Sequence, residues 1–515
     1  MQRDELGLTR VVVLGLAVTV VGWCARPATG DVARAAEGRR FVQDTASGSD
    51  IVQTCAAVEG LGARIDFPPA PPTGPRGGDL LWHRPLEWPV FTTAEITVPH
   101  ASVVAGTWLN PPQETELIPL DSDGTPRWVY PGNLVEVAAS RNAGVVAAVD
   151  FDGTNTVTVR KWHPDSEVPD WSYTIPQAAL GSYRALAVSP DGSIIAVFVT
   201  LQGSPAFSRL YWFGPDSAEP LGSFDGAAGS FARNLSITTH GEYVALMSAA
   251  MVHVIDTSDG SVRFSVSAGA SNDPMAISGD GNYLAYGWTT LYVRKWNGSV
   301  YPLLFARPGG GDSLRQCVFS ADESTLATAW NPTTHLQNRV ELHELPSPTP
   351  LWSYEYEHGA GDYQDIVDNL SITADGSHVA AASWGDQMQT NPEVHVFEHA
   401  QPEPVFTHDT PGSMFDIDIA RGTDGALYLA ACGKHVHANE QGHGGDLYAF
   451  RLLLDLPGDC DADGDVDLDD FGTFAGCLSG PGGGLPPGCQ CADLDGDLDV
   501  DLGDFGGFQA IFTGP

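Results

Sequence analysis

The sequence has little positive charge. Among its 515 residues, 25 are Lys or Arg and 65 are Asp or Glu, so the formal net charge is −40. Such an acidic chain repels the phosphates of nucleic acids, so we expect no nucleic-acid partner. Scarce Lys with abundant Asp suits an extracellular, calcium-rich setting better than the cytosol.

Long hydrophobic runs are also almost absent. The longest, residues 11–23, is short for a membrane span, which needs ~20 apolar residues. It follows two arginines and precedes small residues, an arrangement typical of a secretory signal peptide over residues 1–30. We expect cleavage after Gly30 or Ala35, leaving a chain without a transmembrane span that is secreted or at the cell surface (extracellular or periplasmic). An uncleaved anchor and lipidation at Cys24 are the alternatives.

Cysteine is scarce, with eight residues in the whole chain. Two of them, Cys317 and Cys432, lie in apolar strand patterns and are expected to be buried thiols rather than nucleophiles. Four more gather in the last 56 residues, as in a disulfide framework of an oxidising compartment. These are Cys460, Cys477, Cys489 and Cys491, and their connectivity is open from sequence alone.

What the chain does contain is a repeat. Its 58 Gly and 37 Pro favour turns and short strands over helices. A short strand, a polar turn that often holds Gly and a second apolar strand recur at intervals of 40 to 53 residues. Clear copies are 185–199, 234–248, 274–288, 316–330 and 369–383, and weaker ones are 96–108, 135–151 and 415–432. A third strand and a fourth, often aromatic strand follow each hairpin, which indicates a propeller blade.

These repeats resemble those of the WD-repeat-like and quinoprotein-like β-propeller families. The resemblance rests on the Ser-Pro-Asp-Gly turn at 189–192 and its relatives, and on Trp128, Trp171 and Trp352. It implies a mainly β protein with a propeller over residues 78–453. Eight hairpins predict eight blades, with seven as the alternative. The last repeat has only three strands, so we expect residues 80–85 to close the ring.

Motifs of catalysis are missing. The chain holds neither the G-x-S-x-G elbow of a hydrolase nor a C-x-x-C-H haem attachment. We therefore expect a non-catalytic binding or display platform, and we name no catalytic or cofactor-binding residue. The alternative is a propeller enzyme, polysaccharide-active or quinone-dependent, with its site in the central channel. Carboxylates or His clustered on the channel rim would favour that alternative.

Two further segments complete the propeller region. Residues 31–77 form an N-terminal segment that ends in a Pro/Gly-rich linker. Within the last repeat, His435, His437 and His443 form a small His-rich loop. An i, i+2 spacing in a strand would put His435 and His437 on one side, as a metal site requires. We expect a solvated loop instead.

The C-terminal segment, residues 454–515, is a tandem duplication. From Gly458 onward it has 13 Asp and no Glu, Lys or Arg, and residues 459–481 match residues 493–515 at an offset of 34. Each copy has Asp at positions 1, 3, 5, 7, 9 and 12 of a twelve-residue loop. The Asp residues are Asp459, Asp461, Asp463, Asp465, Asp467 and Asp470 in loop 1 and Asp493, Asp495, Asp497, Asp499, Asp501 and Asp504 in loop 2.

This spacing predicts two calcium ions. Calcium takes six to eight oxygen ligands, with carboxylates at positions 1, 3 and 5, a backbone carbonyl at 7, often a water at 9 and a two-oxygen clamp at 12. Loop 1 has Gly464 at position 6, where the chain turns sharply, whereas loop 2 has Leu498. We therefore expect the second loop to bind calcium more weakly, by roughly tenfold.

The duplicated segment resembles a dockerin, in which each of two calcium loops is followed by one helix. The resemblance implies a small α-helical module that attaches a secreted protein to a cohesin-like or surface protein, often around polysaccharide breakdown. Loop positions 10 and 11, which carry recognition pairs in the best-known dockerins, hold Leu468-Asp469 and Leu502-Gly503 here.

Overall fold

The computed structural model describes 78–87, 90–98, 102–108, 114–132, 134–141, 144–151, 155–180, 185–248, 250–268, 274–332, 338–356, 364–422, 426–440, 442–452, 458–460, 466, 468–486, 489–494 and 499–512. The predicted signal peptide and the segment 31–77 therefore lie outside the described residues. Within the described part, no helix has the length and apolar character needed to cross a membrane.

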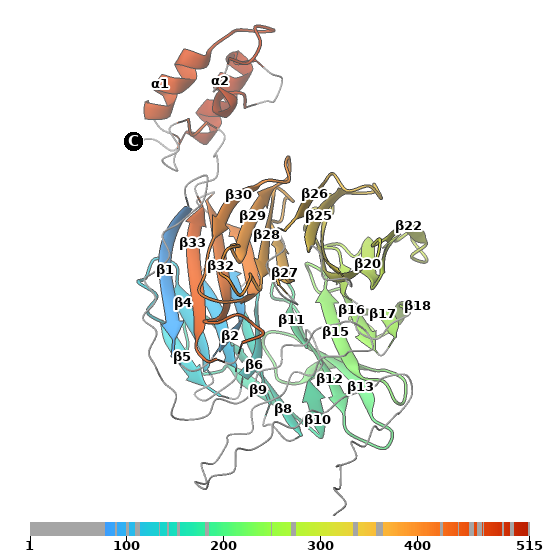
Figure 1. Ribbon diagram of the computed structural model, residues 1–515. Coiled ribbons are helices and arrows are strands. Elements are labelled where there is room, and N and C mark those ends of the chain that lie inside the picture. The colour runs from blue at the N-terminus through green and yellow to red at the C-terminus, as the bar shows by residue number, and fades with distance from the viewer. Residues whose placement is uncertain are drawn as a thin grey trace, which may run out of the picture.

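The described residues before 453 form eight antiparallel sheets, the blades of a β-propeller (Figure 1). This confirms the mainly β fold and the eight blades, and the seven-blade alternative is wrong. Blade 1 consists of β2 (Val90–Thr97), β3 (Ser102–Trp108), β4 (Glu114–Pro119) and β5 (Trp128–Pro131), and blade 2 of β6 (Leu134–Ala139), β7 (Val146–Phe151), β8 (Thr156–Trp162) and β9 (Trp171–Pro176). Blade 3 consists of β10 (Ala178–Leu180), β11 (Leu186–Val188), β12 (Ile195–Leu201), β13 (Phe207–Phe213) and β14 (Pro220–Asp225), and blade 4 of β15 (Ala232–Ile237), β16 (Tyr243–Ser248), β17 (Met251–Asp256) and β18 (Val262–Ser267).

The second half of the ring repeats the same plan. Blade 5 consists of β19 (Met275–Ile277), β20 (Tyr283–Gly287), β21 (Thr290–Lys295) and β22 (Leu303–Pro308), and blade 6 of β23 (Asp312–Phe319), β24 (Thr325–Pro332), β25 (Arg339–Glu344) and β26 (Trp352–Glu355). Blade 7 consists of β27 (Val367–Ile372), β28 (His378–Ser383), β29 (Val394–Glu398) and β30 (Pro404–His408), and blade 8 of β31 (Met414–Arg421), β32 (Leu427–Lys434), β33 (Gly445–Leu452) and β1 (Gly78–Leu86). The first strands of neighbouring blades contact one another, so they form the innermost layer.

The ring is closed by its first strand. β1 pairs antiparallel with β33, from Gly78 opposite Leu452 to Leu86 opposite Gly445. Residues 80–85 thus supply the fourth strand that the last repeat lacks, as the sequence predicts. The closing strand comes from the start of the chain, so it covers an edge that would otherwise expose unpaired backbone groups.

Recurring Trp residues join several of the blades to the following one. Trp128 Nε1 donates to the carbonyl of Pro164 at 2.8 Å, Trp171 Nε1 to that of Pro215 at 2.9 Å, and Trp352 Nε1 to that of His399 at 2.9 Å. Each accepting carbonyl lies in the turn between the third and fourth strands of the following blade. Trp82 in the closing strand donates in the same way to the carbonyl of Pro119 at 3.2 Å.

The Asp-Gly turns are explained by local hydrogen bonding. In the 189–193 turn, Asp191 accepts from the amide of Ser193 at 2.9 Å and from the hydroxyl of Ser189 at 2.7 Å, while Gly192 has φ 74°. Burial raises the pKa of Asp191, but these hydrogen bonds outweigh it and the pKa is lowered. The carboxylate is used to build the turn, as in an Asx-turn.

The C-terminal tail, residues 458–512, holds two α-helices and one 3₁₀ turn. They are α1 (Leu468–Cys477), η1 (Gln490–Ala492) and α2 (Leu502–Ile511). A helix after each loop agrees with the expectation from the duplication. The core is small, with Val466, Phe474, Val500 and Phe508 at its centre. Two disulfides, Cys460–Cys491 and Cys477–Cys489, settle the connectivity that the sequence left open.

Candidate functional site

The tail holds the strongest candidate for a functional site, because both loops bury the acid at position 12. Asp470 and Asp504 are 0% exposed. Asp470 Oδ1 accepts from the amide of Cys460 at 2.6 Å, and Asp504 Oδ1 accepts from that of Leu494 at 2.7 Å. Each contact joins positions 12 and 2 of its loop. The two loops therefore share a geometry as well as a sequence pattern.

Loop 2 brings three carboxylates together. Oxygen atoms of Asp499, Asp501 and Asp504 lie within 4.8 Å of one another. Asp504 also accepts from the backbone amide of Asp501 at 2.7 Å, which places position 12 directly against position 9. Asp501 caps α2 by accepting from the amide of Gly503 at 2.6 Å. Asp501 therefore belongs both to the start of α2 and to the acidic cluster.

This arrangement fits a hard divalent cation. The clustered donors are carboxylate oxygens, which calcium prefers, and the chain has no Lys or Arg from Gly458 onward. Buried carboxylates are costly unless a cation or hydrogen bonds compensate them. The tail sequence itself supplies no Lys or Arg to pair with these carboxylates.

Several predicted ligands lie outside the part of the chain that can be described. Asp459 is buried and Asp493 is half-buried, and both begin their loops. Asp461, Asp463, Asp465, Asp467, Asp495 and Asp497 lie outside the described residues, as do Gly464 and Leu498. Calcium in two loops and the inequality between them therefore stay predictions.

Asp499 differs in detail from the expectation. Position 7 is expected to offer a backbone carbonyl, but the Asp499 side chain itself belongs to the acidic cluster. Its Oδ2 also accepts from the amide of Gly482 in the segment between the repeats. Asp499 therefore ties that connecting segment to the second loop.

The channel wall is the second place to look for chemistry. In six blades the innermost strand has a register shift at the same point, which is a β-bulge that leaves a polar or charged residue after it. The shifts lie between Phe91 and Thr93, Leu134 and Glu136, Ala232 and Asn234, Leu314 and Gln316, Val367 and Asn369, and Met414 and Asp416.

Residues after the bulges bond from blade to blade. Gln316 Nε2 donates to Asn369 Oδ1 at 3.2 Å, and Asn369 Nδ2 donates in turn to Asp416 Oδ1. The other oxygen of Asp416 accepts from the backbone amide of Ala94 at 3.0 Å. This series links blades 6, 7, 8 and 1. Glu136 similarly accepts from the amide of Ala185 at 2.8 Å, joining blades 2 and 3.

Asp418, two residues further along β31, is held by three other blades. It accepts from the amide of Ile96 at 2.8 Å, from the guanidinium of Arg141 at 2.7 Å and from the hydroxyl of Ser371 at 2.9 Å. The pKa of Arg141 is raised, because the charge of Asp418 and its hydrogen bond outweigh the burial that lowers it. These channel carboxylates therefore act as links between blades.

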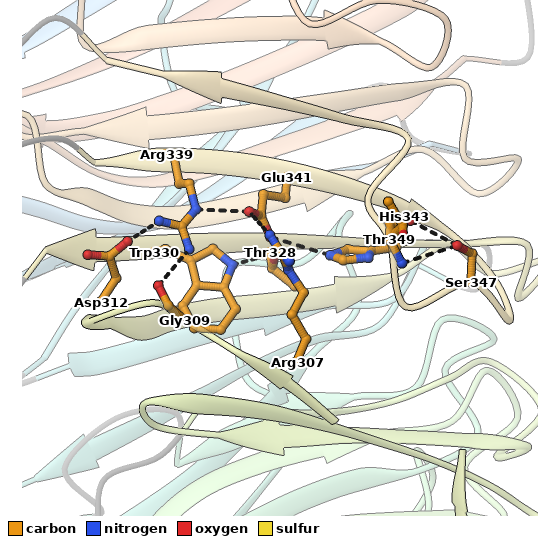
Figure 2. Close-up of polar contacts among 10 residues, drawn as sticks. All are labelled: Arg307, Gly309, Asp312, Thr328, Trp330, Arg339, Glu341, His343, Ser347 and Thr349. Atoms are coloured by element: carbon orange, nitrogen blue, oxygen red, sulfur yellow. Dashed lines mark hydrogen bonds and ion pairs between the residues drawn. The ribbon is translucent and has the colours of Figure 1, made fainter. Parts of the chain in front are cut away.

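A buried charge network lies between blades 5 and 6 (Figure 2). Glu341 on β25 is 1% exposed and accepts from Arg307 on β22 at 3.0 Å and from Arg339 at 2.9 Å. Burial raises the pKa of Glu341, but His343, whose Nε2 lies 3.5 Å from the carboxylate, and the two arginines lower it to about 2. Arg339 also pairs with Asp312, so two positive and two negative charges balance.

The same pairing recurs between blades 8 and 1, which sequence reasoning missed. Glu116 on β4 is 0% exposed and accepts two hydrogen bonds from Arg84 on β1, one of them 2.6 Å long. In both places an arginine of one fourth strand reaches a Glu-Leu pair in the third strand of the next blade. That shared pattern is the signal that could have predicted the contact.

The His-rich loop is not solvated as expected, because β32 ends at Lys434 and the following residues turn inward. His435 Nδ1 lies 2.5 Å from Asp446 Oδ2, while His437 is 5% exposed with Nε2 3.2 Å from the carbonyl of Gly385. His443 Nδ1 lies 2.7 Å from the carbonyl of Glu87. The three imidazoles have separate partners, so this part of the described structure gathers no metal site.

Asp446 itself bridges two histidines. It is 0% exposed and contacts His83 Nε2 at 2.5 Å through its other oxygen. Burial raises the pKa of Asp446, but the hydrogen bonds from His435 and His83 outweigh it and the pKa is lowered. Since His83 lies on β1, this group stabilises the closure of the ring.

The two thiols of the propeller are buried, as predicted. Burial raises the pKa of Cys317 to about 12, and that of Cys432 is also raised well above its usual value. Burial thus disfavours the thiolate form that a nucleophilic cysteine needs.

Comparison with known proteins finds similarity only among solved structures. No protein-family model matches the chain, and no curated protein matches it. Among solved structures it is similar to the β-propeller domain of Cps50 (Swd1) from Myceliophteria thermophila, with 11% sequence identity and a TM-score of 0.43. The similarity covers 73% of this chain and 100% of that domain, and it is too distant to inform function.

Proposed function

We propose that the protein is an exported β-propeller that serves as a non-catalytic binding or display platform. A calcium-dependent, dockerin-like tail attaches it to a partner or surface. The observation that carries the proposal is the pair of buried acids Asp470 and Asp504, held alike in two loops of a segment without Lys or Arg. Calcium supplies positive charge and a coordination shell of oxygens at such loops.

The structure supports a non-catalytic propeller through the state of its charged groups. Asp416 and Asp418 bind backbone amides and side chains of other blades, and Glu341 is enclosed by arginines. A general acid or base must reach a substrate proton, and these carboxylates have their oxygens committed to the fold. These bonds weigh against the enzyme alternative.

Export is supported by the disulfides. Two disulfides within 32 residues of the tail suit an oxidising compartment outside the cytosol. The strongly acidic composition and the signal-like residues 1–30 agree with this location.

Attachment is supported by exposed apolar side chains on the tail. Leu468 and Leu502 occupy position 10 of the two loops and are 62% and 81% exposed. Both begin a helix, and the partly exposed Phe471 follows one turn later on α1. Large apolar groups exposed at matching positions indicate a contact surface. The partner would be a cohesin-like or surface protein.

Calorimetric titration of the whole exported protein with calcium tests the proposal. We expect two bound ions, and we expect Asp470→Asn and Asp504→Asn each to weaken one site by roughly a hundredfold, in line with loss of a charged ligand. Asp469→Asn is the matched control, because it removes one charge from loop 1 at position 11, which supplies no ligand. Unchanged heats in both position-12 variants, or no binding by the unaltered protein, would refute calcium binding.

A second experiment tests attachment. Whole protein immobilised through a propeller lysine should capture the same secreted or surface protein in calcium but not in a chelator. Leu468→Asp with Leu502→Asp should abolish capture while leaving the calcium titration unchanged. Capture that is indifferent to both chelator and these substitutions would place the contact elsewhere.

A further inference from the structure

One disulfide of the tail joins the beginnings of the two calcium loops. Cys460 occupies position 2 of loop 1, and its partner Cys491 lies two residues before Asp493, position 1 of loop 2. The carbonyl of Cys491 also accepts from the amide of Gly458 at 2.8 Å, just before loop 1 begins. A covalent bond and a hydrogen bond therefore hold the two loop entrances together.

The same cysteine is held by a candidate calcium ligand. The amide of Cys460 donates to Asp470 Oδ1 at 2.6 Å, so position 12 binds the backbone of the residue whose sulfur is cross-linked. In loop 2 the equivalent amide belongs to Leu494, which donates to Asp504 but has no cross-link. Among the described residues, the position-12 acid of loop 1 is thus hydrogen-bonded to a disulfide cysteine, and that of loop 2 is not.

The second disulfide differs in place and exposure. It joins Cys477, the last residue of α1, to Cys489 at the start of η1, away from the acidic positions of both loops. Cys477 and Cys489 are 4% and 7% exposed and belong to the tail's core, whereas Cys460 and Cys491 are only half-buried. Access by a reductant thus favours the Cys460–Cys491 bond, since exposed disulfides are the labile ones.

We propose that the Cys460–Cys491 disulfide is a redox control of calcium binding, an inference that rests on the proposed calcium function. A thiolate of a dithiol reductant attacks one sulfur and forms a mixed disulfide, releasing the other cysteine as a thiol. The second thiol of the reductant then displaces the remaining cysteine. Two electrons and two protons pass to Cys460 and Cys491, and the reductant leaves as a disulfide.

Reduction weakens calcium binding because it frees the loop entrances. Calcium requires positions 1 and 12 of a loop to be held at a fixed separation, and the cross-link restricts the conformations that the unliganded chain can explore. Without the cross-link, binding of the ion must also order the loop entrance, and the free-energy cost of that ordering weakens binding. The coupling is reciprocal, so bound calcium must oppose reduction of the bond by the same factor.

The test compares two paired variants of the whole protein. Cys460→Ser with Cys491→Ser should raise the dissociation constant for calcium by about tenfold or more. Cys477→Ser with Cys489→Ser removes the other disulfide and should change it less than about threefold. Equal weakening in both pairs would show a general loss of stability and overturn the proposal, as would no change in the first pair.

A measurement on the unaltered protein keeps the test independent of how the variants fold. Dithiothreitol reduction of each disulfide is followed by alkylation and mass spectrometry, with and without calcium. Calcium should slow reduction of Cys460–Cys491 by about tenfold and affect Cys477–Cys489 much less. Equal rates with and without calcium, in a protein that calorimetry shows to bind the ion, would overturn the redox control alone. Absence of any calcium binding would overturn the proposed function and this inference together.

Discussion

The propeller and the tail are both acidic, but they neutralise their carboxylates in different ways. In the propeller, buried acids have partners from the chain itself, as when Arg307 and Arg339 enclose Glu341 or Arg141 binds Asp418. The tail has 13 Asp and no Lys or Arg. The buried acids of the propeller thus have basic partners within the chain, whereas the tail supplies no Lys or Arg to pair with its own acids.

The two regions also differ in how their stability arises. Each blade of the propeller packs on its neighbours, and β1 closes the ring by hydrogen bonds to β33. The tail has a core of a few residues, which is too little to stabilise so small a unit alone. Two disulfides and, as we propose, two calcium ions compensate for this.

Removing calcium should produce the largest difference in stability between the propeller and the tail. In a chelator, we expect the tail to lose its helices while the propeller keeps its structure, because only the tail depends on an added cation. Hydrogen exchange of the whole protein, read peptide by peptide, measures this. Peptides from 458–512 should exchange fully in the chelator, and those from the strands should not change. Protection that persists throughout the tail would show that its disulfides alone suffice.

Breaking a buried ion pair should have the opposite effect, because it should destabilise the propeller and leave the tail unchanged. Glu341→Ala leaves Arg307 without its acidic partner and Arg339 with Asp312 alone, which costs about 3 kcal/mol of unfolding free energy. Asp165→Ala is the control, because its pair with Arg127 is exposed and should contribute less than about 1 kcal/mol. Urea denaturation, followed by Trp fluorescence, gives both values. A loss of equal size in the two variants would contradict the argument.

Acid should weaken the propeller through buried histidine. His395 is 2% exposed among the rings of Tyr354, Tyr356 and Phe397, and burial lowers its pKa to about 3. The unfolded chain protonates this group near pH 6.5 and the folded one does not, so stability falls as pH drops from 6.5 towards 3. At pH 5 the loss from this one group is about 2 kcal/mol.

His395→Phe should remove that acid sensitivity. Phe retains an aromatic ring among aromatic neighbours and carries no titratable group, so stability at pH 7.5 should change little. At pH 5 the variant should be more stable than the unaltered protein by about 2 kcal/mol in urea denaturation. The same change at exposed His163 serves as the control and should have no effect at either pH. An equal pH dependence in the variant and the unaltered protein would show that His395 does not contribute.

Local patterns predict the blades well, because each hairpin has a recognisable sequence pattern within about fifteen residues. The strand at 80–85 could also be assigned, since its Trp matches those of the other fourth strands. The contacts between blades could not, because they join distant residues. Arg141 and Asp418 are 277 positions apart, and nothing in their neighbourhoods encodes the pairing.

The calcium loops and the His-rich loop both show how far a spacing rule reaches. Positions 2 and 12 of a calcium loop are near in sequence, and the structure does bring Asp470 to Cys460 and Asp504 to Leu494. The His-rich loop was misjudged because strand periodicity was extended past the end of β32, where the chain turns inward. The i, i+2 rule applies only within the strand whose geometry produces it, and β32 ends before the histidines.

Glu323 offers the finest test of how the propeller satisfies its acids. In the turns of neighbouring blades this position is Gly, with φ 71° at Gly281 and 69° at Gly376, but Glu323 adopts φ 60° with a full side chain. Its carboxylate accepts from the amide of Asp280 at 2.9 Å and from Asn282 Nδ2 at 2.7 Å, both in the corresponding turn of the preceding blade. Neutral donors of another blade thus hold a charged group in a strained backbone.

Substitution separates the two contributions at this position. Glu323→Gly loses the hydrogen bonds across the turns but relieves the backbone, whereas Glu323→Ala loses the bonds and keeps the strain. Both variants should be less stable than the unaltered protein, with Ala lower than Gly by about 1 kcal/mol. Urea denaturation at neutral pH measures the order. If Gly proves more stable than Glu, the strain exceeds the hydrogen bonds and this acid weakens the ring. If Ala equals Gly, the left-handed backbone costs nothing here and the carboxylate alone explains why Glu stands in place of Gly.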